Sequence, residues 1–215
     1  MSSSTGFSQT LRDSTQFLHQ QAHDSPFISE LMSGKRSLAD YTALAAQQYF
    51  VYHALESMAA RLAEDEVVGG FHSAELSRVP EIEKDLAFLI GPQWRELISP
   101  LPATADYLEQ INRSAEWPVG FIAHHYTRYL GDLSGGQIMQ RLLQRQFGLD
   151  LDGVRFYSFP AIPKTKPFKD QYRAKLDALS LVPAEQERVV AEVHAAFKLN
   201  IAMFADLADT SAAAA

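Results

Sequence analysis

The sequence predicts a single-domain, all-α protein, on three observations. Apolar residues recur at helical spacing along most of the chain, no stretch shows the apolar–polar alternation of a strand, and helix-capping residues occur throughout. With 215 residues, 47% of them apolar, the chain is long enough for one full-sized core and short for two. We expect one domain over residues 1–215, with an ordered helical core at about 6–208 and a flexible tail at 209–215.

The predicted elements are eight or so helices, at about 6–23, 26–34, 37–64, 80–91, 104–114, 118–147, 168–179 and 183–208, with an irregular connection at 157–167. Capping residues place several of these boundaries. Ser25 followed by Pro26 suits a helix start, because Ser is a favoured N-cap and Pro fits the first helical position. Ser37 with Asp40 resembles a capping box, and Pro80 precedes acidic residues that the helix dipole favours in a first turn.

Composition and charge exclude several classes of function. The formal net charge of −7 and the pI of about 5.5 argue against a general nucleic-acid binder. The chain has no cysteine, which rules out disulfides, thiolate nucleophiles, zinc–thiolate sites, iron–sulfur clusters and thiolate-ligated haem. The N-terminus does not resemble a secretory signal, and no apolar run approaches the roughly 18 residues that span a bilayer. We therefore expect a cytoplasmic protein that binds neither nucleic acid nor membrane.

The predicted helix at 118–147 contains Gly131, Gly135 and Gly136 within little more than one turn. Each glycine costs about 0.5–1 kcal/mol relative to alanine in a helix interior, so a compensating role is expected. Gly131 and Gly135 share one face, where a bare backbone admits either a closely packed helix or a flat ligand. Asp132, a carboxylate among apolar neighbours, must face solvent or join a polar network. These residues alone leave helix packing and ligand binding as alternatives.

His19 and His23 lie one turn apart on the first predicted helix, and two metal-enzyme patterns fail here. A zincin motif needs Glu directly after its first His, where Gln20 stands. No His in the chain has a Glu three residues before it, as the carboxylate-bridged di-iron bundles require. A lone helical His is most often structural, so spacing alone leaves His19 an open candidate for a metal ligand.

Basic residues concentrate between positions 163 and 175, where Asp170 is the one acidic residue. Lys169 and Arg173 share a helix face at i,i+4 spacing and suit the paired carboxylates of a ligand. Arg12 is seven residues before His19 and therefore lies on the same face of the first helix. The alternative is a solvated basic helix, which such runs usually form.

The glycine-rich segment Gly131–Gln137, preceded by Ala123–Leu130, resembles the signature of the haem oxygenase family. Further segments that resemble this family occur in the expected order: Leu18–Ala22, Tyr49–Glu56, Asp85–Phe88, Gly91–Trp94, Phe168–Arg173 and Ala196–Asn200. The resemblance extends from about residue 8 to 207. It implies a haem-oxygenase-like multihelical fold, with haem between the first helix and a glycine-kinked distal helix.

The resemblance also implies the residues around haem b, which is both cofactor and substrate. His19 matches the axial iron ligand, as a neutral imidazole. The matching distal, catalytic residues are Asp132, Gly131, Gly135, Tyr52, Arg128 and Asn200, among which Asp132 holds an ordered-water network. Arg12, Tyr126, Lys169 and Arg173 match positions that bind the propionates. The other expected haem-binding residues are Ser134, Gly136, Phe197 and Phe204, of which the two phenylalanines have ordinary core packing as the alternative.

The activity that the resemblance implies is cleavage of haem at a meso carbon, giving biliverdin, carbon monoxide and Fe²⁺. The reaction uses O2 and electrons from an external reductase, such as a ferredoxin, a flavodoxin or an NAD(P)H-dependent reductase. With the propionates held by Arg12, Lys169 and Arg173, we expect cleavage at the α-meso position by a monomeric enzyme. The alternative is a non-catalytic haem carrier or sensor on the same scaffold, against which Asp132 and Gly131 argue.

One position departs from the family pattern. Four residues after the axial histidine the family usually has Glu near the proximal imidazole, and this chain has His23. We interpret His23 as a solvent-exposed neutral replacement. The alternative is that His23 competes with His19 for the iron.

Overall fold

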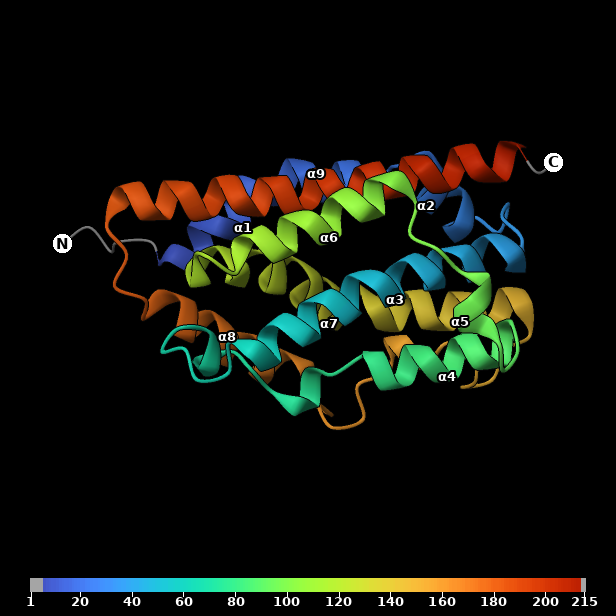
Figure 1. Cartoon of the computed structure of the whole chain (residues 1–215), viewed down its shortest axis with the longest axis horizontal. Coiled ribbons are helices and arrows are strands. Elements are labelled where there is room, and N and C mark those ends of the chain that lie inside the picture. The colour runs from blue at the N-terminus through green and yellow to red at the C-terminus, as the bar shows by residue number, and fades with distance from the viewer. Residues whose placement is uncertain (1–5, 214–215) are drawn as a thin grey trace.

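The computed structural model describes residues 6–213 and shows packed helices joined by loops (Figure 1). The α-helices are α1 (Phe7–His23), α2 (Pro26–Met32), α3 (Leu38–Arg61), α4 (Val79–Leu89), α5 (Trp94–Leu97), α6 (Pro102–Ser114), α7 (Pro118–Phe147), α8 (Thr165–Asp177) and α9 (Pro183–Ala213). Short 3-10 helices lie in the connections: η1 (Val68–Gly70), η2 (Ala74–Leu76) and η3 (Arg155–Tyr157). Residues 6–213 contain no β-strand, which confirms the predicted all-α class. Within this range, no helix is both long enough and apolar enough to cross a membrane.

Several predicted helix boundaries differ from the structure. The single turn α5 is absent from the prediction, and α6 begins at Pro102 instead of Thr104. α8 begins at Thr165, inside the predicted irregular connection, because a proline such as Pro167 is tolerated in a first helical turn, where its missing N–H has no helical acceptor. α9 continues to Ala213, so residues 209–213, predicted to belong to a flexible tail, are helical.

The two predicted N-caps have different outcomes. Ser37 caps α3 as predicted, because its hydroxyl accepts the N–H of Asp40 while the Asp40 carboxylate accepts the N–H of Ser37. Ser25 is the N-cap residue of α2 and Pro26 follows it as predicted, but the side chain makes no capping bond, since its hydroxyl donates to the carbonyl of Ala22 at 2.8 Å. The short turn between α1 and α2 brings the last carbonyls of α1 within reach of the Ser25 hydroxyl, and they compete for it.

A continuous apolar core connects the helices. α9 packs along α1, α6 and α7, and α3 packs against α4 and α6 (Figure 1). Leu11, Leu55 and Phe121 are among the side chains buried in this core. A smaller cluster holds Trp94 of α5, which is buried and meets the ring of Tyr49 edge-on at 4.8 Å between centroids. The burial of this large aromatic side chain explains the unpredicted turn.

The helix α7 changes from a core helix to a surface helix at its glycines. Nearly every side chain in 120–130 is buried, including the polar residues His124, His125 and Arg128. Most residues in 131–138 are exposed, although the helix continues without a break. The glycine-rich part of α7 is therefore where a central helix reaches an open face of the molecule.

The buried carboxylate of Asp85 in α4 holds the loop that contains η3. Its two oxygens accept the backbone N–H groups of Arg155 and Phe156 at 2.9 Å and 2.8 Å. Burial nevertheless raises the pKa of Asp85 to about 6, against the opposing effect of these hydrogen bonds. The same loop is held from α3, where the Tyr41 hydroxyl donates to the carbonyl of Gly153 at 2.7 Å.

We expect the stability loss caused by Asp85→Asn to depend on pH. Because the pKa of Asp85 is raised in the fold, the native state binds a proton that the unfolded state releases between about pH 4 and pH 6. The wild type therefore loses roughly 2–3 kcal/mol of unfolding free energy, relative to the variant, as pH rises through this interval. Urea titrations from pH 4 to pH 7 measure the difference, with the exposed Asp152→Asn as control. A difference that widens with rising pH would contradict this account.

Candidate functional site

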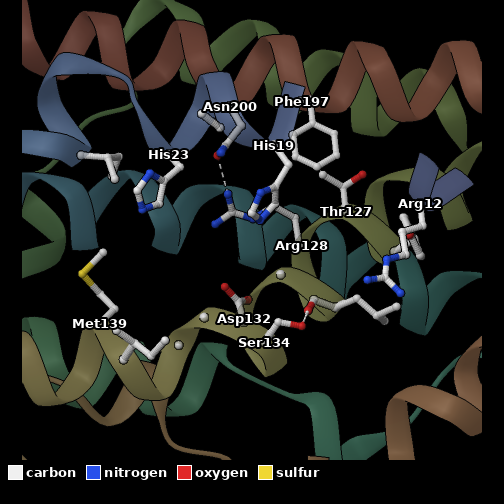
Figure 2. Close-up of a pocket in the computed structure, with 18 of the residues that line it drawn as sticks. Arg12, His19, His23, Thr127, Arg128, Asp132, Ser134, Met139, Phe197 and Asn200 are labelled. Atoms are coloured by element: carbon white, nitrogen blue, oxygen red, sulfur yellow. Dashed lines mark hydrogen bonds between the residues drawn. The ribbon is translucent and has the colours of Figure 1, made fainter. Parts of the chain in front are cut away.

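A cavity of about 990 Å³ lies between α1 and α7, with α8 at one end and α9 also contributing to its wall (Figure 2). All but one of the predicted site residues line it: Arg12, His19, Tyr126, Arg128, Gly131, Asp132, Ser134, Gly135, Gly136, Lys169, Arg173, Phe197, Asn200 and Phe204. The exception is Tyr52, which is fully buried in α3 and reaches the cavity only through its bond to Asp132. The structure thus brings together residues from four separate helices.

His19 projects from α1 into this cavity (Figure 2). The buried face of α1 includes Leu11, Leu18 and Ala22, so the neighbouring position 19 stands at the edge of the core. Its imidazole meets the Phe197 ring edge-on, with centroids 6.4 Å apart, and makes no hydrogen bond to any residue in 6–213. Both ring nitrogens are therefore available to a ligand in the cavity.

The opposite wall is the bare face of α7. A Cβ added at Gly131 or Gly135 would meet no atom within 4 Å outside its own helix turn, so both positions are open to the cavity. A Cβ at Gly136 would instead contact Tyr157 at 3.5 Å. Close helix packing therefore does not explain Gly131 and Gly135, and a flat ligand against the backbone remains as the explanation of their cost.

Two hydrogen-bonded pairs stand beside the glycines. The Tyr52 hydroxyl donates to the Asp132 carboxylate, and the Arg128 guanidinium donates to the side-chain oxygen of Asn200. The guanidinium also lies 5.0 Å from the centre of the Tyr52 ring. Burial raises the pKa of Tyr52 well above its usual value, so its hydroxyl stays protonated and donates.

The carboxyl group of Asp132 is held in balance between opposing influences. Burial raises its pKa, while the charge of Arg128 and the hydrogen bond from Tyr52 lower it, and burial prevails. A carboxyl group whose pKa is raised at the edge of a cavity is a candidate for proton transfer.

Some buried polar groups of α6 and α7, including one of Arg128, lack a protein partner in the range 6–213. Among the buried polar atoms that have no partner within the described residues are Oγ1 of Thr104 and the hydroxyl of Tyr107 on α6, and Nδ1 of His124 and Nε of Arg128 on α7. Buried polar groups of this kind are normally satisfied by ordered water. The sequence signal that could have revealed them is the pair of polar residues at positions 104 and 107, three apart on the buried face of α6.

One end of the cavity is cationic. Arg12 from α1 lies at this end (Figure 2), and Lys169 and Arg173 from α8 also line the cavity. The Nζ of Lys169 donates to the hydroxyl of Ser134 at 3.0 Å. Burial, and then the charge of Arg173, lowers the pKa of Lys169, which is typical of a cation held close to another cation. Burial raises the pKa of the Tyr126 hydroxyl, and the charges of Arg173 and Arg12 oppose this effect. Four groups therefore converge on this end.

Only some of the basic residues between positions 163 and 175 line this cavity. Lys166 is exposed and pairs with Asp170, and Lys175 donates to the carbonyl of Gly70. The alternative of a solvated basic helix therefore fits the exposed part of α8, whereas Lys169 and Arg173 face the cavity.

The other end of the cavity is mainly apolar. Met139 and His23 lie at this end (Figure 2), and Ile28, Met32 and Ile138 add further apolar surface to the cavity wall. The side chain of His23 is 52% exposed, and its Nδ1 lies 2.9 Å from a carboxylate oxygen of Asp24. The cavity thus suits a large ligand that is apolar over most of its surface and anionic at one end.

Known proteins resemble this chain over nearly its whole length. A family model described as heme oxygenase matches residues 5–206. A heme oxygenase from Rhodella violacea is 38% identical over 205 residues, covering 94% of this chain and 87% of that protein. Heme oxygenase 1 from Pongo abelii is 35% identical over 204 residues, covering 93% and 71%. The crystal structure of heme oxygenase-1 from the cyanobacterium Synechocystis, in complex with heme, matches with a TM-score of 0.92 at 33% identity, over 98% of this chain and 96% of that one.

We expect Gly131→Ala and Gly135→Ala each to raise the free energy of unfolding of the ligand-free protein by about 0.5–1 kcal/mol. Alanine is the better helix former, and the added methyl group meets no neighbouring atom. Urea titration measures the change. Gly120→Ala is the matched control and should destabilise, because its Cβ would lie 2.3 Å from a ring atom of Trp117. Destabilisation by the first two substitutions would show that their face is not open.

Proposed function

The chain belongs to the haem oxygenase family, and from this membership we propose how its cavity binds haem b and supports haem degradation. The reaction consumes haem, O2 and electrons, and it releases biliverdin, carbon monoxide and Fe²⁺. The observation that carries the proposal is the open backbone at Gly131 and Gly135, because a flat porphyrin needs a wall without side chains. Bound haem supplies the oxygen-activating iron and is itself the molecule that is cleaved.

The residues present fit haem at each part of the cavity. The anionic propionates fit the cationic end at Arg12, Lys169 and Arg173, and the apolar ring edge fits the opposite end. The unpartnered Nε of Arg128 and the polar atoms near it fit ordered water next to the ring. This combination supports a tetrapyrrole in preference to a smaller anion, which would leave the apolar end of the cavity unused.

His19 is proposed as the protein ligand to the haem iron. A neutral imidazole uses one ring nitrogen for the metal, and both nitrogens of His19 lack a protein partner in the described structure. A neutral histidine donates less electron density to the iron than a thiolate does. A thiolate ligand would favour cleavage of the O–O bond. The choice of ligand therefore suits an enzyme that oxidises the porphyrin.

Asp132 is proposed to hold and move protons through ordered water. Tyr52 donates to the carboxylate and so orients it, while Arg128 opposes the effect of burial on its pKa. Arg128 is itself fixed by its bond to Asn200. A carboxyl group that acts through water supplies protons to the cavity without placing a strong acid against the reacting atoms.

The cationic end is proposed to orient the ring in its plane. Arg12, Lys169, Arg173 and Tyr126 come from three helices and converge on one end of the cavity. If they hold both propionates, one edge of the ring faces Asp132 and the glycines in every bound molecule. We expect that edge to carry the α-meso carbon.

The electron donor is proposed to be an acidic redox protein, such as a ferredoxin, a flavodoxin or an acidic NAD(P)H-dependent reductase. Lys164, Lys166 and Lys175 are exposed on or beside α8, close to the cationic end of the cavity. Complementary charge of this kind accelerates the encounter between redox partners. The monomeric state and the cytoplasmic location stay predictions from the sequence.

We expect His19→Ala to abolish the normal Soret spectrum of the haem complex, and His23→Ala to leave it nearly intact. The reason is that His19 stands free in the cavity, whereas His23 is half exposed and bonded to Asp24. Anaerobic haem titration followed by absorption spectroscopy measures both variants, and free imidazole should restore the spectrum of His19→Ala. The reverse pattern would identify His23 as the ligand.

We expect Asp132→Asn to bind haem within about threefold of wild-type affinity and to form biliverdin at least ~100-fold more slowly, because a general acid typically contributes that factor. The measurement is bleaching of the Soret band after addition of reductant and O2, with chromatography of the product. Asp152→Asn, on an exposed loop, is the control. A stable wild-type haem complex that never bleaches would identify a carrier or sensor, and a product other than the α isomer would overturn the orientation proposed for the propionates.

A further inference from the structure

A second histidine of α7, His125, is buried on the side of the helix that faces α8. Only 3% of its surface is exposed, and its Nδ1 lies 2.9 Å from the hydroxyl oxygen of Tyr172. The two rings are nearly parallel, at 10° with centroids 5.8 Å apart. His125 also packs against Tyr129, with centroids 4.4 Å apart. This contact belongs to none of the roles assigned above.

The partner, Tyr172, stands at a sensitive place on α8. It follows Lys169 by three residues and directly precedes Arg173, the two α8 cations that line the cavity. Its side chain is 3% exposed and packs against Phe71, with ring centroids 4.9 Å apart. On α7, His125 directly precedes Tyr126, which lines the same end of the cavity. The buried pair therefore joins the two helices beside their ligand-facing side chains.

Both members of the pair are neutral at ordinary pH. Burial, reinforced by His72, lowers the pKa of His125 to about 3, and burial, reinforced by Tyr126, raises the pKa of Tyr172 well above its usual value. The hydrogen bond thus joins an uncharged imidazole to a protonated phenol. Removing either partner leaves a buried polar atom without a bond, which is costly.

A single axial imidazole does not determine how a flat ring is rotated about the bond to its metal. The rotation must be determined by contacts at the ring edge, and here those contacts are the cations of α8 and Arg12 of α1. The position of α8 relative to α7 therefore determines which edge of the ring faces Asp132. A small shift of one packed helix is enough to move such an edge.

We propose that His125 and Tyr172 are positioning residues that hold α8 in register with α7 and so determine which meso carbon is cleaved. This inference rests on the proposed function, since it concerns the orientation of the same haem. The pair does not touch the reacting atoms and acts through Lys169 and Arg173. The hydroxyl of Ser134 on α7 accepts a hydrogen bond from the Lys169 ammonium at 3.0 Å, which is a second side-chain hydrogen bond between the same two helices.

The test compares Tyr172→Phe, His125→Phe and His125→Asn with the wild type, as full-length proteins loaded with haem. Asparagine places an amide atom near the position of the histidine Nδ1 and is expected to restore the bond. The matched control is Tyr41→Phe, which removes a buried hydroxyl bonded at 2.7 Å to Gly153, away from α8. The measurements are the biliverdin isomer ratio, the haem affinity and the thermal midpoint.

We expect Tyr172→Phe and His125→Phe to weaken haem binding about fivefold and to raise a second biliverdin isomer to about a tenth of the product or more. His125→Asn should restore most of the wild-type ratio, and Tyr41→Phe should lower the thermal midpoint without changing the isomers. The double variant of His125 and Tyr172 should be no worse than either single variant, because both remove the same bond.

The inference is overturned if the two phenylalanine variants lose stability but keep the wild-type isomer ratio and haem affinity, since the bond would then be merely structural. A wild type that binds haem without forming biliverdin refutes the proposed function separately. If the wild type forms no biliverdin, the haem affinity still tests the inference about His125 and Tyr172. Tyr172→Phe would then overturn the inference by binding haem as tightly as the wild type does.

Discussion

The site depends on one steric constraint, which is the absence of side chains on the cavity face of α7. Gly131 and Gly135 lower the helix propensity of a segment that otherwise has every helical feature, and no neighbouring helix fills the space that they leave. Across this space stands the free imidazole of His19 on α1. A wall without side chains facing a metal-binding group is a suitable container for a planar metal complex, and the other features of the cavity are arranged around it.

The polar residues of the site form two groups, one around Asp132 on α7 and one around the cations of α8. On α7, Asp132 lies between Gly131 and Gly135, where desolvation raises its pKa while Arg128 and Tyr52 oppose this effect. Beside the glycines, α8 brings Lys169 and Arg173 to the same cavity from a partly exposed surface. The proposed function therefore assigns proton supply and ligand orientation to different elements, so that the alignment of α7 with α8 would connect the two roles.

Much of the helical framework was predictable because its signals are local. The capping box of Ser37 and Asp40 and the proline at the start of α7 are recognisable within a few residues, and the structure contains both. The turn at Trp94 was not predictable, since it exists because a distant pocket buries the indole. The hydroxyl of Ser25 likewise bonds to the preceding helix, because the tertiary turn offers a competing acceptor.

By itself, the sequence determined the all-α class, the eight longer helices and the family, and through the family resemblance it indicated many of the residues that line the cavity. Those properties follow from periodicity, capping and a contiguous motif, which are all short-range along the chain. Only the tertiary structure decided that Gly131 and Gly135 face open space, that Tyr52 reaches Asp132, and that His125 bonds to Tyr172. Each of these depends on the separation of groups up to 80 residues apart, and that separation arises only when the helices pack.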